Sequence, residues 1–538
     1  MTTFHHARVF TGTGEHGWAG AFRIEGGRFT WVGDATRLSA AERSTAVDLG
    51  GRTVLPGLLD VHTHPAMMAT LADAVPCLPP AVTSIEDLLD ALRASSGPGP
   101  DGWLVGYGYD DAKFPGRRGP TAADLDRVSS SRPILVHRCD GHSAVANTAA
   151  LARAGVTAGT PDPPGAAFGR YPDGRPNGVL TELAAVARVA DARPAPDRRQ
   201  LIDRLAGLGQ HFLSHGLVGV GDLLATVVPE PLATFRAAAA AGPFPRTALY
   251  LGWPDGGPPA GSPAGGPVGG PVELTDDDRT GPVRVAGVKL FLDGAFSNRT
   301  AWTRAPYPGS DDHGVRIAGD DTLRAAAAWC RRNRVQLAVH AMGDRALDRV
   351  VDLLGDQEPW LDVLPSIRLE HATLLAPAFL ARLSAARMRF AVVTHTIFLF
   401  AEFDGYARNL APHQVADAYP IRSLYESGLP AALASDRPAT AWADADDVFT
   451  SVRAAVTRRA YDGSDLGRAQ AVTVAQALLL YTGRAAAVAP FPGLGQIRPG
   501  ADGSFVVVDP DPFAVPPDEL DRVRVVQTWV DGTLAYRR

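Results

Sequence analysis

The stretch LPGLLDVHTHP, residues 55–65, joins an apolar run to two histidines that are one residue apart. Side chains alternate faces along a β-strand, so His62 and His64 would point to one face and Thr63 to the other. Two imidazoles aimed at one point favour a metal site. The pair alone is weak evidence, because the chain has 14 histidines and composition nearly supplies such a pair by chance. The histidine pair therefore indicates a metal site only if the later strands also end in metal-binding residues.

Length and composition indicate a large protein of ordinary globular character. The chain has 538 residues, of which 20% are charged and 46% hydrophobic, and its formal net charge is −6. Because no basic block occurs, the sequence predicts no nucleic-acid partner and no anionic membrane surface, and a small-molecule substrate fits better. Homo-oligomers are common for large barrel proteins, but no signal in the sequence itself indicates one.

The cysteines and the N-terminal stretch bear on the compartment. Cys77, Cys139 and Cys330 are scattered, without the spacing of a disulfide framework or of a thiolate zinc site. This usage predicts the reducing cytoplasm. We expect no secretion signal and no membrane span, because the chain does not begin with a basic region followed by an apolar stretch and has no run of about 18 apolar residues.

Both ends of the chain predict β structure. Residues 1–55 contain short β-branched and aromatic runs separated by Gly and Asp, and residues 490–538 contain GSFVVVDP and VRVVQTWVDGTLAY. The Asp531-Gly532 pair in the last run is typical of a tight hairpin. We expect the two ends to form one small β-sandwich domain beside a larger middle.

The middle, residues 56–489, alternates apolar strand-like runs with Ala- and Leu-rich helical stretches, which is typical of β-α units around a parallel sheet. The eight strand candidates are GLLDVHTH (57–64), LVGVGDLL (217–224), TALYLGW (247–253), GVKLFLDG (287–294), QLAVHAMGD (336–344), IRLEHATLL (367–375), RFAVVTHTI (389–397) and AALASDRP (431–438). A closed (β/α)8 barrel needs eight strands, so we predict the α/β class and a TIM-like barrel. Asp344 is expected to cap the helix that follows the fifth strand.

Two segments interrupt this alternation. Residues 66–200 separate the first two barrel strands by far more than an ordinary β-α connection, so they predict an inserted subdomain with strands of its own at WLVGYGY (103–109) and ILVHRCDG (134–141). Residues 254–282 begin with PDGGPPAGSPAGGPVGGP, which cannot bury enough apolar surface to order itself. We expect a flexible loop there, either a tether or a mobile lid.

Polar side chains stand at the carboxyl ends of five predicted strands, where barrel enzymes carry their functional groups. They are His62 and His64 on the first strand, Lys289 on the fourth, His340 on the fifth, His371 on the sixth and Asp436 on the eighth. A single histidine in a strand is more often a core residue. Chance alone would not place polar residues at the ends of several strands in the expected order. Histidine and carboxylate sets suit zinc, manganese, iron or nickel. Glu370 would face away from His371, so a structural ion pair is its expected role.

Lys289 is the unusual member of this set. An ammonium inside a barrel is costly to desolvate and would be repelled by nearby metal ions. Carboxylation by carbon dioxide removes both objections, because a carbamate is anionic and can bridge two ions about 3.5 to 4 Å apart. An unmodified lysine beside a single ion is the alternative.

The order His-x-His, Lys, His, His, Asp resembles the amidohydrolase superfamily of metal-dependent hydrolases. Within it, LPGLLDVHTH, GVKLFLDGAFSNRTAW, HAMGDRALD, RLEHATLL and ASDRP resemble the YtcJ-like branch that includes N-substituted formamide deformylases. The resemblance extends to WLVGYGYD, DGHSAVANTAAL and DGRPNGVLTE in the insertion, and to QALLLYTGRAA near the end. It is specific for the fold and the metal site, and much less so for the substrate.

The resemblance implies a hydrolase that cleaves a C–N bond of a small molecule, such as an N-substituted formamide, with a hydroxide shared by two divalent ions, zinc above all. His62 and His64 would hold one ion, His340 and His371 the other, and carboxylated Lys289 would bridge them. Asp436 would contact a metal, take the proton of the attacking water and pass it to the leaving nitrogen.

Five further polar residues are candidate substrate contacts: His142, Asp293, Arg299, Asp344 and His395. Turn formation and loop pinning are equally good roles for most of them. The chain also departs from its relatives, since Arg437 stands where they typically carry Trp, and Thr394 and His395 stand where they have Gln-Pro. The substrate of a relative therefore cannot be transferred directly.

Two other functions stay open at this point. One is a mononuclear deaminase or cyclic-amide hydrolase in which Lys289 is unmodified. The other is a non-catalytic binding protein on the same scaffold, against which the full set of six candidate ligands argues. Metal content separates the three, with two ions, one ion or none per chain.

Overall fold

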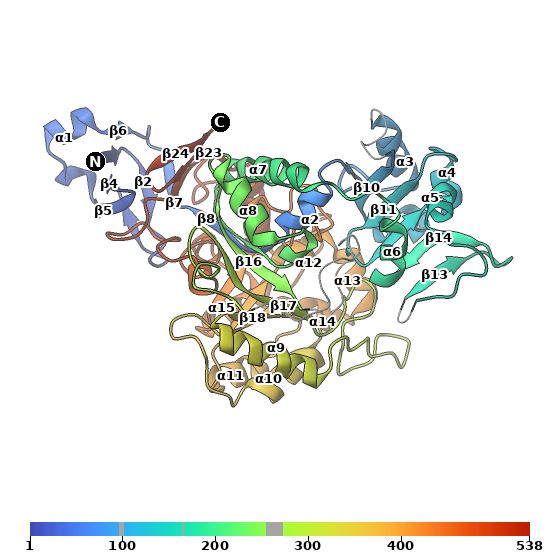
Figure 1. Ribbon diagram of the computed structural model, residues 1–538. Helices are drawn as coiled ribbons and strands as arrows, with labels where there is room; N and C mark the ends of the chain where they lie inside the picture. The colour runs from blue at the N-terminus through green and yellow to red at the C-terminus, as the bar shows by residue number, and fades with distance from the viewer. Residues whose placement is uncertain (96–101, 164–165, 254–272) are drawn as a thin grey trace.

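The computed structural model of the chain describes residues 1–95, 102–163, 166–253 and 273–538 (Figure 1). Its centre is a parallel sheet of eight strands in the order β21-β20-β19-β18-β17-β16-β15-β8. The strands are β8 (Leu58–Thr63), β15 (Leu217–Asp222), β16 (Arg246–Gly252), β17 (Val283–Phe291), β18 (Gln336–Ala341), β19 (Ile367–His371), β20 (Phe390–Thr394) and β21 (Ala431–Leu433). Each overlaps one of the eight predicted runs, so the predicted TIM-like barrel is confirmed.

The first and last strands meet at their carboxyl ends. The Asp436 amide donates to the carbonyl of His62 at 2.8 Å, and the His64 amide donates to the carbonyl of Arg437 at 2.9 Å. These bonds bring the ends of β8 and β21 together and place Asp436 beside the histidine pair. Closure of the sheet thus assembles residues that lie more than 370 positions apart in the chain.

Strand alternation divides the core of the barrel. Val288, Leu290 and Leu292 face outward and pack in one apolar cluster with residues of the surrounding helices. Small and β-branched side chains such as Val61 and Ala338 belong to a separate cluster inside the sheet. The helices of the middle segment are α7 (Arg198–Ser214), α8 (Pro231–Ala240), α9 (Asp320–Asn333), α10 (Asp344–Leu354), α11 (Pro377–Ala385), α12 (Thr396–Ala401), α13 (Phe403–Asn409), α14 (Pro412–Asp417), α15 (Ile421–Glu426), α16 (Val448–Thr457) and α17 (Val474–Leu479).

Helix α10 begins differently from the prediction. Its N-cap residue is Gly343, and no side chain caps it. Asp344 is instead the first helical residue, and its carboxylate accepts a hydrogen bond from the Arg304 amide at 2.8 Å. The expected cap at Asp344 is therefore wrong by one residue, because this side chain fixes a neighbouring loop and leaves the helix end uncapped.

The two ends of the chain form paired β-sheets. One sheet has the order β5-β4-β1-β6, and the other has the order β24-β23-β22-β7-β2-β3. Their elements are β1 (Thr2–His5), β2 (Arg8–Phe10), β3 (Trp18–Ala19), β4 (Ala21–Glu25), β5 (Arg28–Gly33), α1 (Ala40–Thr45), β6 (Val47–Asp48), β7 (Thr53–Pro56), β22 (Phe505–Asp509), β23 (Arg524–Val530) and β24 (Thr533–Arg537). Phe4, Phe22, Phe29 and Phe505 pack between them. Asp531 and Gly532 both have positive φ, 48° and 77°, as the predicted hairpin turn requires.

The insertion carries a sheet of its own, at the right of Figure 1. Its strand order is β13-β14-β12-β11-β10-β9. Its elements, with the helix α2 that leads into it, are α2 (Pro65–Thr70), β9 (Val75–Pro76), α3 (Ile85–Ala94), β10 (Leu104–Tyr109), α4 (Ala122–Asp126), β11 (Ile134–Arg138), β12 (Ser143–Ala146), α5 (Thr148–Arg153), β13 (Ala167–Arg170), β14 (Pro176–Thr181) and α6 (Leu183–Ala190). Most of the predicted 254–282 loop, residues 254–272, lies outside the described residues.

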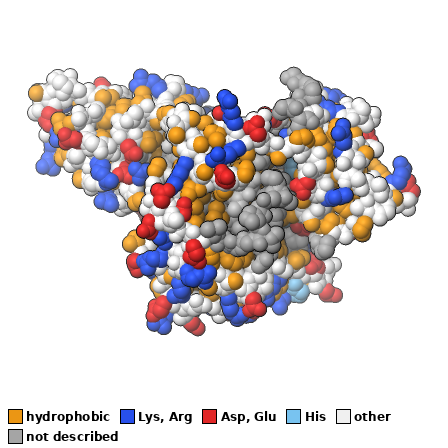
Figure 2. Space-filling view, viewed as in Figure 1, with side chains coloured by type: hydrophobic (Ala, Val, Ile, Leu, Met, Phe, Trp, Pro, Cys, Tyr) orange, Lys and Arg blue, Asp and Glu red, His pale blue; other side chains and the backbone are white. Residues whose placement is uncertain are grey.

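The surface of the described residues agrees with the modest net charge. Figure 2 shows Lys and Arg side chains interspersed with Asp and Glu side chains over the visible face. Among the described residues, no helix combines the length and apolar character needed to cross a membrane.

Candidate metal centre

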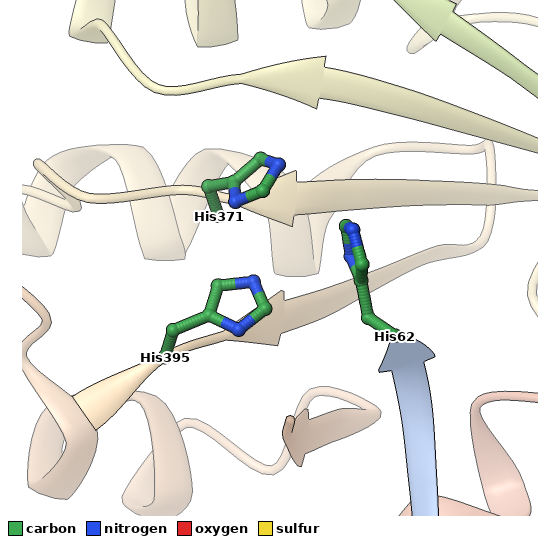
Figure 3. A group of neighbouring side chains, drawn as sticks. All are labelled: His62, His371 and His395. Carbon is green, nitrogen blue, oxygen red and sulfur yellow. The ribbon is translucent and has the colours of Figure 1, made fainter. Parts of the chain in front are cut away.

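Three histidines converge from the carboxyl ends of different strands. His62 stands on β8, His371 ends β19 and His395 follows β20, and Figure 3 shows their rings turned toward a common space. One ring nitrogen from each lies within 4.8 Å of the others. His62, His64 and Asp436 form a second group that meets the same limit and shares His62. We call these five residues the barrel cluster.

Backbone geometry explains how neighbouring residues reach this space. Strict alternation would turn His371 away from the side occupied by Glu370, but His371 has a φ of +70°. Asp436 likewise has a φ of +54°. Positive φ is uncommon for residues other than Gly and costs of order 1 kcal/mol or more. At both strand ends this strained backbone turns a side chain into the barrel cluster.

Glu370 holds His62 from inside the barrel. Its Oε2 atom lies 2.7 Å from Nδ1 of His62, and its Oε1 atom accepts from Nε of Arg368 at 2.7 Å. Burial alone would raise the pKa of Glu370, but Arg368 and His62 outweigh it and hold that pKa well below its usual range. The expected ion pair is present, and the contact with His62, which strand alternation does not predict, fixes Nδ1 as the donor and leaves Nε2 facing the cluster.

Several buried ring nitrogens in this cluster have no hydrogen-bond partner. They are Nδ1 of His64, both nitrogens of His371 and Nε2 of His395. An unpaired buried polar group costs about 1 to 3 kcal/mol. Imidazole nitrogens and a carboxylate are the donors that Zn²⁺ and similar ions prefer, so the residues present fit a divalent metal.

Lys289 lies at the edge of the same space. Its side chain is buried, and its Nζ atom is 3.4 Å from Nε2 of His62. Burial lowers the pKa of Lys289 to about 8, although Glu370 and Asp436 act to raise it. The uncharged amine, which is the form that reacts with carbon dioxide, is therefore more abundant at neutral pH than in an ordinary lysine.

His340 is close to the cluster without joining either group. Its ring centroid lies 4.4 Å from that of His371, but its Nε2 atom is 3.1 Å from the carbonyl oxygen of Gly294. A hydrogen bond from Nε2 of His340 to this carbonyl oxygen would leave only Nδ1 free to bind a metal. Its role as a metal ligand stays a prediction.

Asp436 is the charged centre of the cluster. Its Oδ1 atom is 2.8 Å from Nε2 of His64 and 3.2 Å from Nε2 of His62. Burial acts to raise the pKa of Asp436, but His62 and His64 overcome it and hold that pKa well below its usual range. The carboxylate is therefore ionised and can accept a proton or bind a cation.

A small pocket opens in front of the cluster. It encloses about 80 Å³, and Phe291, Phe296, Met342 and Phe398 form much of its wall. We call it the reaction pocket. Glu402 also lines it, and burial followed by the nearby Asp110 raises the pKa of Glu402 to about 8. Sequence reasoning missed Glu402, because a single acidic residue after the apolar run IFLFA (397–401) forms no motif.

The structure places the five candidate substrate residues differently. His142 reaches the reaction pocket from the insertion, with Nδ1 3.2 Å from Oε2 of Glu182. His395 belongs to the barrel cluster instead. Asp293 is buried beside the pocket and accepts hydrogen bonds from the amides of Trp302, Met342 and Gly343 at 2.9, 3.0 and 2.8 Å.

The structure does not bring Arg299 or Asp344 to the reaction pocket. Arg299 donates from Nη2 to the hydroxyl of Ser310 at 2.7 Å, and Asp344 holds the Arg304 amide. Both side chains pin loops, the alternative role considered from the sequence.

A second His and carboxylate group lies elsewhere. His211 lies in the last turn of α7 and His215 directly follows this helix, and both come within 4.8 Å of a carboxylate oxygen of Asp446. Nε2 of His211 is 2.6 Å from Oδ2 of Asp446. The Arg437 guanidinium bonds the other oxygen of Asp446 and lies 3.1 Å from Nε2 of His211. We call these three residues with Arg437 the helix cluster.

Comparison with known proteins finds relatives along the whole chain. A model described as the amidohydrolase family matches residues 45–536. The chain is 28% identical to an N-substituted formamide deformylase of Arthrobacter pascens, over 99% of this chain and 98% of that protein. It is 27% identical to the putative amidohydrolase YtcJ of Bacillus subtilis, over 99% of both. A crystal structure of an uncharacterized metal-dependent hydrolase from Pyrococcus horikoshii superposes with a TM-score of 0.72 at 22% identity, covering 96% of this chain and 99% of that one.

Proposed function

Because the chain belongs to the amidohydrolase family and is a hydrolase acting on C–N bonds, we propose that it cleaves the amide bond of N-substituted formamides. The formamide substrate is suggested by the deformylase relative, which matches over nearly the full length of both chains. The relation at 28% identity supports the reaction class more strongly than the substrate.

One observation carries the catalytic proposal: buried imidazole nitrogens without partners surround an ionised aspartate at the carboxyl end of the barrel. Such an arrangement is unfavourable in a protein unless a cation completes it. The same end of the barrel is where enzymes of this fold place their chemistry.

We propose that the barrel cluster, with His340 and Lys289 beside it, holds zinc. His62 and His64 would hold one ion, His340 and His371 would hold a second, and carboxylated Lys289 would be a ligand of both. When bound, such ions lower the pKa of water toward neutrality and polarise a carbonyl oxygen. The buried position of Lys289 beside His62 supports the carbamate, because an anionic bridge is far less costly there than an ammonium.

The chain's own residues would perform the remaining steps. The Asp436 carboxylate would accept a proton from the attacking water at Oδ1 or Oδ2 and deliver it to the leaving nitrogen. Glu370 would keep His62 in one tautomer throughout. The aromatic wall of the reaction pocket would exclude bulk water, which strengthens each of these electrostatic contacts.

A single-ion site is the second candidate, and His395 supports it. Its Nε2 atom is unpartnered and lies with His62 and His371 in a three-histidine group. Three histidines with one open position are a known catalytic arrangement for zinc. In this candidate Lys289 is unmodified, and the reaction is deamination or cyclic-amide hydrolysis.

Hydrolysis assays on the metal-loaded protein test the proposed function. The protein is stripped with a chelator, reloaded with zinc in bicarbonate, and assayed for formate release from N-methylformamide and N-hexylformamide beside acyl-amino acids and cyclic amides. We expect zinc-dependent formate release from the formamides. Turnover of cyclic amides alone would support the second candidate, and no turnover with any substrate would contradict both.

The lysine bridge has a test of its own. Lys289→Ala should abolish activity and lower the metal content, and short carboxylic acids should restore part of both by occupying the position of the carbamate. Near-normal activity in the variant would show that Lys289 bridges nothing.

A further inference from the structure

A second and larger cavity lies beside the reaction pocket, between the barrel and the insertion. It encloses about 550 Å³, against about 80 Å³ for the reaction pocket. Thr70 and Leu71 line it from the end of α2, Leu135 and Ala190 from the insertion, and Val227 from the barrel side. We call it the outer cavity. Its size is in the range of sites for drug-sized ligands, whereas the reaction pocket holds only a few heavy atoms.

The two spaces share part of their walls. Met67, Gly141 and Ala439 line both the reaction pocket and the outer cavity. Gly141 has no side chain, Ala439 has a single methyl group, and Met67 is an unbranched and adaptable side chain. The reaction pocket and the outer cavity are therefore adjacent, and Gly141 and Ala439 add little bulk to the partition between them.

The wall of the outer cavity favours an apolar occupant without a negative charge, because the exposed carboxylate of Asp191 lines it and would repel an anion. The Arg138 guanidinium lines it but is already bonded to Asp110, Asp111 and Asp140. Arg193 also interacts with other groups of the protein, so it is not a free cation. Burial, followed by the charge of Arg193, lowers the pKa of His137 to about 4, so this imidazole is neutral at pH 7. Leucine, valine and proline side chains supply much of the remaining wall.

The partition of Met67, Gly141 and Ala439 lies close to Asp436, the proposed proton donor to the leaving nitrogen. Met67 is on the helix that directly follows His64, and Ala439 donates its amide to the carbonyl of Asp436 at 2.8 Å. Since Asp436 is the proposed donor to the leaving nitrogen, a group attached to that nitrogen points toward this partition. The acyl group would then lie toward the aromatic side chains of the reaction pocket.

We propose that the outer cavity binds the N-substituent of the substrate, so that the enzyme selects amides with a very small acyl group and a long or bulky, uncharged apolar group on nitrogen. This inference rests on the proposed function and specifies its substrate class. Ordinary apolar burial makes each added methylene worth roughly a factor of four in kcat/KM, since about 0.8 kcal/mol is gained per buried CH₂. A hexyl group should therefore exceed a methyl group by well over tenfold.

Cavity-filling variants test the assignment in the zinc-loaded enzyme. Ala190→Trp fills the outer cavity from α6, and Thr70→Phe fills it from α2; both positions are half-buried and line that cavity alone. Ala184→Trp is the matched control, because Ala184 is exposed on the same helix as Ala190 and lines neither space. The substrates are N-methylformamide, N-hexylformamide, N-formyl-6-aminohexanoate and hexanamide, and thermal midpoint and metal content check the integrity of each variant.

The proposal predicts a selective loss. Both filling variants should lower kcat/KM for N-hexylformamide about tenfold or more while N-methylformamide changes less than twofold, and Ala184→Trp should change neither. The wild type should prefer N-hexylformamide over the carboxylate-ended substrate and over hexanamide. Equal losses on the long and short formamides, no loss on either, or a loss confined to hexanamide would overturn the assignment. Failure of the wild type to hydrolyse either formamide, with zinc bound, would instead contradict the proposed function.

Discussion

The molecule holds two groups of histidine and aspartate side chains that look alike in composition and differ in their surroundings. In the barrel cluster, buried nitrogens of His64, His371 and His395 have no partner. In the helix cluster, Asp446 is already bonded by His211 and by the Arg437 guanidinium. The comparison teaches that ligand chemistry alone does not define a metal site. A site also needs donor atoms that the protein leaves unsatisfied.

The difference has an electrostatic cause. A divalent ion at the helix cluster would lie beside the permanent charge of Arg437, which already neutralises Asp446. Lys289 lies beside the barrel cluster, but an amine can lose its charge or become a carbamate, whereas a guanidinium cannot. We therefore expect metal in the barrel cluster and a structural role for the helix cluster.

The largest expected effect separates the two aspartates by activity. Asp436→Asn keeps the shape of the side chain but removes the proton acceptor, so kcat should fall about 10² to 10⁴-fold. Asp446→Asn should keep kcat within a few-fold. Formate release by the zinc-loaded variants measures both, and a similar loss in the two variants would remove the distinction.

The next effect is on folding. Asp446→Asn leaves the largely buried Arg437 without its anionic partner, so the free energy of unfolding should fall by up to about 3 kcal/mol, the lower end of the range for broken buried pairs. Denaturant unfolding measures the change. An unchanged stability accompanied by loss of a bound ion would mean that the helix cluster is itself a metal site.

A smaller effect is expected from the residue that positions His62. Glu370→Gln weakens the hold on Nδ1 of His62, so metal affinity should fall about 10 to 100-fold. The variant also leaves the buried Arg368 without its anionic partner, so metal affinity is measured under conditions where the variant is shown to be folded. Competition with a chelator of known affinity gives the change. Glu370 would have no role in the barrel cluster if the variant bound metal as tightly as the wild type.

The smallest effect concerns the pH dependence of stability. The pKa of Glu402 is raised to about 8, so between about pH 4.5 and pH 8 the folded state binds more protons than the unfolded state. Stability of the metal-free protein should therefore fall as pH rises through this window, with at most about 1.4 kcal/mol per pH unit from Glu402. Glu402→Gln should reduce that slope, and the remainder should come from Asp60 and Asp293, whose pKa values burial raises to about 7. An equal slope in both proteins would show that Glu402 contributes nothing to it.

Much of the barrel could be predicted because its signals are local. Runs such as QLAVHAMGD and IRLEHATLL combine strand periodicity with a polar residue at the end, and each occurs in a β-strand of the barrel. The terminal hairpin could be predicted for the same reason, since Asp531 and Gly532 specify the turn by themselves. The first residues of helices are harder to predict, since the N-cap residue of α10 is Gly343 and not the predicted Asp344.

The details of the site depend on features that periodicity does not contain. The positive φ of His371 breaks the alternation from which Glu370 was expected to face away from the histidines. The pairing of Arg437 with Asp446 and His211 joins the loop after the last strand to a helix that begins more than 200 residues earlier. Sheet closure and loop packing create these contacts, so no short stretch of sequence reveals them.

Metal content per chain tests the central claim most directly. Elemental analysis of the purified, zinc-loaded protein is compared with His371→Ala in the barrel cluster and His215→Ala in the helix cluster as its matched control. We predict two equivalents of zinc in the wild type, loss of at least one in His371→Ala, and no loss in His215→Ala. A wild type without bound metal, or a loss confined to His215→Ala, would contradict the account.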